Sequence, residues 1–387
     1  MAFTEVSSQS WFSRIGGSIK GVLFGLVLFV IAFPVLFWNE GRAVETFKTL
    51  NEGSGVVINA PADVLDSANE GKLIHVSGYA NTSNILTDAI MNISTTAIKL
   101  SRNVHMFQWV ESSESETKKK VGGGTTTTTT YSYYKEWSSS HHDSNQFKEQ
   151  SGHQNPSAMP YQSTSWTAPK VNIGPYRLSQ SLVGDIQNSE VFPVPVNHPN
   201  VGNLHESRGI LTSQQNSEPQ VGDIKVTYRA IMPTDVSVIA QQNGDTFIPY
   251  QADAGGNILM LEHGIVTAES MFVSAHADNV AMTWMLRIVG FFIMFFGIRM
   301  MFKVFVVLAD VVPFLGSIAN AGVGLISFVI TLALSALTIG IAWIFYRPLL
   351  GISIIAITAG AIWWTRNKVK ATPSTPPAPP ASMPPAP

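Results

Sequence analysis

The sequence predicts an α+β membrane protein in which four transmembrane α-helices carry a large β-rich extracytoplasmic domain, inserted between helices 1 and 2. Two observations lead to this class. Long apolar runs lie near both ends of the chain, and only 13% of its 387 residues are charged, against about 25% in a typical soluble domain. Between these runs, short alternating segments separated by turn residues indicate strands.

The first apolar run predicts a transmembrane helix over residues 19–38. A bilayer core needs about 20 apolar residues, whereas the core of a signal peptide has about 7–15 and is followed by small residues. This run ends instead in Pro34, Phe37 and Trp38, which are typical of an interfacial anchor. We therefore expect an uncleaved helix, with a signal anchor as the minor alternative.

Three further spans are predicted near the C-terminus. Residues 283–308 contain an apolar core between Arg287 and Arg299, whose side chains we expect to reach opposite interfaces. Residues 323–346 carry no charge, and residues 348–364 follow after a single residue. The last two spans therefore predict a tight helical hairpin.

An even number of spans places both termini on one side, where seven basic residues gather: Arg14, Lys20, Arg299, Lys303, Arg366, Lys368 and Lys370. The positive-inside rule makes that side cytoplasmic. We expect a cytoplasmic N-terminus over residues 1–18, a periplasmic or lumenal domain over 39–282, a cytoplasmic loop over 309–322 and a cytoplasmic, proline-rich, disordered tail over 365–387. The net charge of −2, without a basic stripe, gives no indication of nucleic acid.

Within the predicted domain, alternating segments with turn residues between them indicate an antiparallel meander of about four strands, over residues 222–231, 236–242, 246–251 and 257–264. A further strand is expected over 71–80 and a short amphipathic helix over 178–187. The glycine- and threonine-rich segment 117–130 is of low complexity, so we expect a mobile loop there.

Catalytic and metal-binding signals are weak. The chain has no cysteine, which excludes disulfides, thiolate metal sites and cysteine nucleophiles. His141, His142 and His153 are weak candidates for a metal, because adjacent histidines point apart on a helix or a strand. No serine-hydrolase, Walker or dinucleotide-binding motif occurs. We assign no catalytic residue and no cofactor; a membrane-surface enzyme, using Glu40, Arg42, His141, His153 or Glu136, is the alternative.

Small residues recur along the apolar segments and predict helix packing. Gly17, Gly21 and Gly25 are spaced by four, and small polar residues line one face of the third span; the residues assigned to packing there and in the fourth span are Ser327, Thr331, Ser335 and Gly360. Small residues let membrane helices approach closely. A transport path usually contains an ionisable residue at mid-depth, and the first, third and fourth spans have none. Packing is therefore favoured, and a channel or transporter is the third alternative.

The segment that follows the first span is predicted to join the membrane to the domain. Trp38 is expected at the interface, with Asn39, Glu40 and Arg42 just beyond it. Arg42 could bind lipid phosphate or Glu40. Because Phe47 and its aliphatic neighbours give the segment an apolar face, we expect it to dock under the domain.

Several long motifs occur in order along the chain, among them "FWNEGRAV" at 37–44, "LSRNVHMFQWVE" at 100–111, "GDIKVTYRAI" at 222–231, "NVAMTWMLRIVG" at 279–290 and "WIFYRPLL" at 343–350. Together they make the chain similar to the transmembrane protein 43 (LUMA) family, from about Trp11 to Lys370. The family usually has Glu and Tyr where this chain has His105 and Phe107, and the Gly–Thr insert and proline tail are peculiar to this chain. These departures favour a distant, bacterial member.

The resemblance implies four membrane helices, a large domain between the first two and no established catalytic activity. It implies the endoplasmic reticulum and inner nuclear membrane as compartments in a eukaryote, where members are linked to nuclear-envelope organisation, and the inner membrane in a bacterium. From the residues and this resemblance we expect a non-enzymatic multipass scaffold that organises membrane-protein complexes or membrane structure. Its expected partners are membrane lipid, other membrane proteins and further copies of the chain.

Overall fold

The computed structural model describes residues 3–349 together with residues 353, 356, 357, 360 and 363. Within this part of the chain, three helices are long and apolar enough to cross a membrane: α1 (Trp11–Val56), α3 (Ala268–Ala309) and α4 (Pro313–Tyr346). Most of the predicted fourth span at 348–364, and the whole predicted tail at 365–387, lie outside the described residues.

Helices α1 and α3 are longer than the predicted spans. The Ser10 side chain caps the start of α1, and the helix continues past Trp38 to Val56, so the predicted domain at 39–282 begins with helical residues. Helix α3 likewise begins at Ala268 rather than at residue 283. Hydropathy locates only the apolar part of each helix. The extensions of α1 and α3 pack against each other, for example at Gly53 of α1 and Phe272 of α3.

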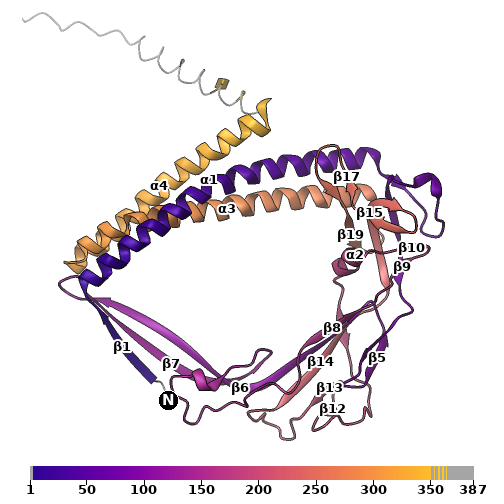
Figure 1. Ribbon diagram of the computed structural model, residues 1–387, viewed down its shortest axis with the longest axis horizontal. Helices are drawn as coiled ribbons and strands as arrows, with labels where there is room; N and C mark the ends of the chain where they lie inside the picture. The colour runs from indigo at the N-terminus through magenta and orange to yellow at the C-terminus, as the bar shows by residue number, and fades with distance from the viewer. Residues whose placement is uncertain (1–2, 350–352, 354–355, 358–359, 361–362, 364–387) are drawn as a thin grey trace, which may run out of the picture.

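The β-rich region consists of two main sheets (Figure 1). The first has eight strands: β1 (Phe3–Gln9), β7 (Thr125–Ser138), β6 (Lys99–Lys119), β14 (Ile224–Ile231), β13 (Ile210–Thr212) and β12 (His205–Ser207) in that order, with β11 (Glu190–Phe192) on β14 and β8 (Thr164–Thr167) on β6. The second has seven, in the order β19 (Met260–His263), β15 (Thr234–Asn243), β16 (Thr246–Ile248), β10 (Tyr176–Arg177), β9 (Asn172–Ile173), β3 (Leu73–Asn81) and β2 (Ile58–Asn59).

Small elements complete the fold: the pairs β4 (Ile85–Asp88) with β5 (Ile93–Thr96) and β17 (Tyr250–Gln251) with β18 (Asn257–Ile258), and the short helix α2 (Gln180–Asp185) at the predicted position. One apolar core joins the two sheets, with Val76 of β3, Val104 of β6 and Val238 of β15 fully buried in it. The β-rich region therefore has the core that its alternating strands predict.

The predicted four-stranded meander is wrong in its connectivity. The predicted strand at 222–231 is β14, which pairs with β6 in the first sheet, whereas the next strand in the sequence, β15, pairs with β3, β19 and β16 in the second. The chain passes from one sheet to the other at Met232 and Pro233. Proline cannot donate a ladder hydrogen bond, which agrees with the break between β14 and β15 at this point.

The predicted mobile loop at 117–130 is also wrong. These residues form the distal part of an antiparallel hairpin of β6 and β7, with Thr117 opposite Thr127, and only residues 120–124 make the turn. Threonine is β-branched and favours strands. Cross-strand hydroxyl pairs reinforce the ladder, at 2.9 Å both between Ser115 and Thr129 and between Thr117 and Thr127.

The long helices, the β6–β7 hairpin and the β-rich region together form a closed frame (Figure 1). β1 pairs with β7 along its whole length, and the hairpin tip reaches the far end of the helices, where Lys119 contacts Asp310 at 2.6 Å. Residues 1–18 were predicted to lie across a membrane from residues 39–282. The β1–β7 ladder places residues 3–9 directly beside residues 125–131 of that predicted domain, and the side of the membrane on which each lies stays a prediction.

Candidate functional site

A buried polar joint connects the three long helices at the level where α1 leaves its apolar segment. The Glu40 carboxylate on α1 is fully buried. It accepts hydrogen bonds from Arg287 Nε of α3 at 2.6 Å, from Arg287 Nη2 at 2.8 Å and from Trp343 Nε1 of α4 at 2.8 Å. Both carboxylate oxygens are thus satisfied, and one anion holds two other helices.

The neighbouring turn of α1 carries a second set of contacts to α3. Arg42 donates to Asn279 Oδ1 at 3.1 Å and to Thr283 Oγ1 at 3.0 Å. Asn39 donates to the Thr283 carbonyl at 3.0 Å, and Asn279 donates to the Ala43 carbonyl at 3.0 Å. These bonds fix the register of the two antiparallel helices, because each joins a side chain of one helix to a particular turn of the other.

Close packing surrounds the polar groups. A Cβ on Gly41 would lie 2.6 Å from the Tyr346 ring, so only glycine lets α4 end there. Phe37 contacts the same ring at a centroid distance of 5.2 Å. The Arg287 guanidinium lies 4.8 Å from the Trp284 ring centroid, a favourable cation–π geometry. The aromatic rings therefore shield much of the ion pair from water, which strengthens it.

A cavity of about 560 Å³ lies beside the joint, between α1, the end of α4 and the β17–β18 turn. Trp38, Arg42, Lys48 and Tyr346 line it. Thr49 also faces it; its hydroxyl is buried and has no hydrogen-bond partner among the described residues, and neither has Arg42 Nε. The cavity therefore combines cationic, aromatic and unpaired polar groups next to the joint.

The structure brings the predicted joint residues together, with two differences. Arg42 does not bind Glu40 but the polar side chains of α3, and Arg287, which was expected to reach the interface, is paired with Glu40 and largely buried. Trp38 is 59% exposed, beside the polar cluster rather than in it. Sequence reasoning missed Arg287, Asn279 and Trp343 as partners; the arginine within an apolar segment was the one available signal.

The residues predicted to pack helices differ in their surroundings. A Cβ on Gly25 would lie 2.7 Å from the Gly297 carbonyl oxygen, one on Gly21 would be 3.9 Å from Met300, and one on Gly17 would have nothing within 4 Å. Gly360 likewise faces open space among the described residues. The three α4 residues predicted to pack helices, Ser327, Thr331 and Ser335, are all buried. Ser335 lies 3.7 Å from the Met294 sulfur of α3.

The histidines considered for a metal do not assemble a site. His141 contacts the Pro156 carbonyl at 2.7 Å, and His153 contacts the Glu149 carbonyl at 3.0 Å while stacking on Tyr133. His142 contacts the Ser138 hydroxyl at 3.2 Å. In the part of the chain that the structure describes, no group of three His, Asp or Glu side chains could hold a metal ion. The hydrogen bonds of these ring nitrogens therefore support the loop after β7.

The residues of the enzyme alternative are also separated. Glu40 and Arg42 lie in the joint on α1, and Glu136 lies on β7 opposite Gln108, on the other side of the frame (Figure 1). His141 and His153 belong to the segment that follows β7. The proposed acid–base cluster is therefore not formed by the described residues.

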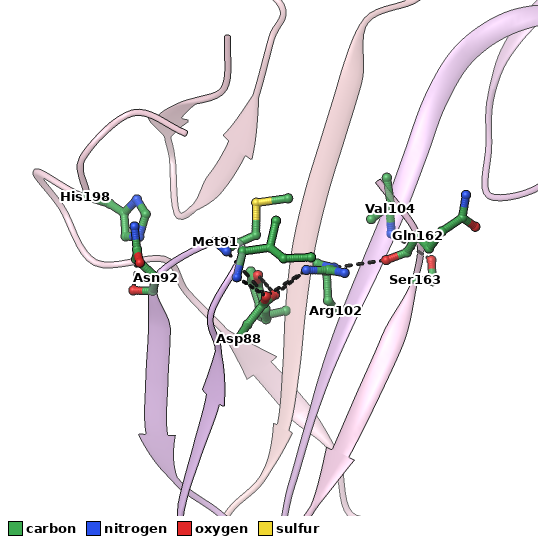
Figure 2. A network of polar contacts seen from close by, with 10 residues as sticks. Asp88, Met91, Asn92, Arg102, Val104, Gln162, Ser163 and His198 are labelled. Atoms are coloured by element: carbon green, nitrogen blue, oxygen red, sulfur yellow. Dashed lines mark hydrogen bonds and ion pairs between the residues drawn. The ribbon is translucent and has the colours of Figure 1, made fainter. Parts of the chain in front are cut away.

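A second buried ion pair lies in the β-rich region, where sequence reasoning predicted nothing (Figure 2). Arg102 of β6 donates to both oxygens of Asp88, at 2.8 and 2.7 Å, and Tyr228 of β14 donates to Asp88 at 2.6 Å. Burial, followed by the Asp88 contact, raises the pKa of Tyr228 above its ordinary value. The Asp88 carboxylate also accepts from the Met91 backbone amide at 3.3 Å. Every partner is internal, so this group stabilises the core.

Helices of membrane-spanning length that a buried ion pair joins to one another, together with a large β-rich region, define a helical membrane protein. Residues 106–348 match the family model described as Transmembrane protein 43. Proteins of that name from Mus musculus and Rattus norvegicus are 34% and 35% identical, over 95% and 89% of both chains. The Transmembrane protein 43 homolog of Drosophila melanogaster is 31% identical, over 90% of this chain and 94% of its own. The chain belongs to the transmembrane protein 43 family. No solved structure matches it.

Proposed function

We propose that the chain is a non-enzymatic multipass membrane scaffold, which sets the position of its β-rich domain relative to the membrane and assembles with other membrane proteins and with further copies of itself. The observation that carries this proposal is the polar joint. One buried carboxylate, Glu40, binds Arg287 of α3 and Trp343 of α4. Such a joint supports a fixed arrangement of the three helices, which a scaffold needs and a flexible tether does not supply.

The helix surfaces support assembly. Large apolar side chains remain exposed along α1, α3 and α4, including Leu23, Phe292 and Leu332. Gly17 lies on such an exposed surface, with space around it that a second helix could enter. Small residues of this kind let membrane helices approach closely. The compartments that we propose follow the family: endoplasmic reticulum and inner nuclear membrane in a eukaryote, or the inner membrane in a bacterium.

Native mass spectrometry of the full chain in detergent tests the proposal. We expect dimers or larger assemblies, and a Gly17→Leu variant is expected to reduce them by filling the space. Gly16→Leu is the matched control, because a Cβ there also meets nothing within 4 Å but points about 100° away around the helix. A strict monomer with no co-purifying membrane protein would count against the scaffold.

A further inference from the structure

A second cavity lies at the end of the helices opposite the polar joint. It measures about 370 Å³ and opens where α1, α3 and α4 meet the tip of the β6–β7 hairpin. Four basic side chains line it: Arg14, Lys119, Arg299 and Lys303. Among the lining residues that the structure describes, Asp310 supplies the negative charge. The cavity therefore has an excess of positive charge.

Asp310 cannot balance the whole cluster. It is fully buried, and its two oxygens are already engaged, one by Arg14 at 2.5 Å and the other by Lys119 at 2.6 Å. Arg299 contacts an uncharged acceptor, the Asn320 side-chain oxygen, at 3.4 Å. Lys303 has no carboxylate within ion-pair distance in the described chain. Two cations thus face the cavity without an anionic partner.

The walls of the cavity are apolar. Phe296, Met300, Val306 and Val323 line it next to the basic groups. Phe296 is 49% exposed and continues into the open apolar surface of α3. A soluble anion such as free phosphate would use the basic groups but not this wall. A phospholipid matches both, because its headgroup is anionic and its acyl chain is apolar. Basic pockets between membrane helices bind anionic headgroups in this way.

We propose that this cavity binds the phosphate headgroup of an anionic phospholipid, with Arg299 and Lys303 on the phosphate and the acyl chain against Phe296. The arginine fork can bind two phosphate oxygens at once, and lysine acts as a point charge. Arg14 and Lys119, held by Asp310, keep the hairpin tip in place as the remaining wall. The bound lipid would strengthen the contact between hairpin and helices, whether or not the chain acts as a scaffold.

The test uses the full chain in a neutral detergent, with native mass spectrometry to count bound lipids during titration with phosphatidic acid or phosphatidylcholine. We expect phosphatidic acid to be retained and phosphatidylcholine to be lost. The double variant Arg299→Gln with Lys303→Gln should weaken retention about 30-fold, from two lost cations. Lys20→Gln is the matched control: it removes one exposed positive charge from α1, outside the cavity lining, and should leave retention within about threefold.

Three outcomes would overturn the assignment of this cavity to an anionic phospholipid. Equal retention of the two lipids would show that charge does not select the ligand, and an equal loss in Lys20→Gln would show a diffuse surface effect. If inorganic phosphate displaces phosphatidic acid at equal concentration, the cavity takes free phosphate and not a lipid. The exchange variant Arg299→Lys with Lys303→Arg keeps both charges and should restore most of the binding, which separates lost charge from misfolding. Subunit number is read from the same spectra, so failure of the scaffold proposal is scored separately.

Discussion

Removing the carboxylate of the polar joint should destabilise the whole helical assembly. Glu40 is fully buried and accepts three hydrogen bonds of 2.6 to 2.8 Å, two of them from Arg287. In Glu40→Ala the guanidinium would remain largely buried without its counter-charge, which costs about 3–5 kcal/mol. The lost acceptor for Trp343 adds about 1 kcal/mol. Glu40→Gln keeps an acceptor for Trp343, so its cost should be closer to 3 kcal/mol.

The matching change on α3 supports a double-mutant cycle. Arg287→Met leaves the Glu40 carboxylate buried without its cation, again at a cost of about 3–5 kcal/mol. Replacing both groups, as Glu40→Leu with Arg287→Met and with Glu40→Leu alone as the other single variant of the cycle, leaves neither charge uncompensated, and apolar replacement of a buried pair is often nearly neutral. We therefore expect the double variant to be far more stable than the sum of the single costs predicts, with a coupling of about 3 kcal/mol.

Unfolding in detergent, followed by tryptophan fluorescence, measures these differences, since Trp343 and Trp284 both contact the pair. Glu45→Gln is the control, because Glu45 is an exposed carboxylate on the same helix and its replacement should change the free energy of unfolding by no more than about 0.5 kcal/mol. Additive single costs, or a Glu40→Gln variant as stable as this control, would refute the conclusion that the pair joins the helices.

Three further predictions concern the β-rich region and the frame. Arg102→Met, which leaves a buried carboxylate unpaired, should cost about 3–5 kcal/mol in urea unfolding; a cost below about 1 kcal/mol would exclude a structural role. Burial, and then the neighbouring Lys225, lower the pKa of His105 in the folded chain. The folded state therefore favours the neutral imidazole, and the free energy of unfolding should fall as the pH drops from about 6.5 towards the lowered pKa. His105→Gln should reduce that slope, and an unchanged slope contradicts the assignment. The chain has no cysteine, and Ser7 and Thr127 lie opposite each other in the β1–β7 ladder. The double variant Ser7→Cys with Thr127→Cys should therefore form a disulfide in membranes. If the two thiols instead react with reagents added on opposite sides of the membrane, the ladder is open there.

Local properties of the sequence predict the parts of the fold that depend on them. Apolar runs locate the three described long helices, and alternation locates β3, β14 and β15 close to their observed bounds. The partners of those strands depend on contacts between distant residues, which periodicity does not contain. The threonine tract at 125–130 is a second case in which pairing with other residues of the chain decides the structure. Its composition indicates disorder, but pairing with residues 114–119 makes it a strand.

The candidate site follows the same division. Trp38, Glu40 and Arg42 were identified because they interrupt an apolar run, a local signal. That Glu40 binds Arg287 could not be predicted, because it requires the register of α1 against α3 over about 250 intervening residues, and the sequence gives no distances. Glu40, one of the two partners considered for Arg42 beside lipid phosphate, does not contact it for a geometric reason. Residues two apart on a helix point about 200° apart, so the two side chains face different neighbours.

The closed frame constrains how the protein can lie in a bilayer. Helix α1 is about 69 Å long, from 46 residues at about 1.5 Å each, and the 21 residues of β6 span about 70 Å. The hairpin can thus reach from one end of the helices to the other. Its distal part is rich in Thr, Ser, Lys and Glu and has unpaired strand edges, which cannot lie in hydrocarbon. While β1 is paired with β7 and Asp310 holds the hairpin tip, both ends of α1 stay attached to the β-rich region. Crossing the bilayer requires the β1–β7 ladder and the Asp310 contacts to open, so these contacts determine which arrangement the helices adopt.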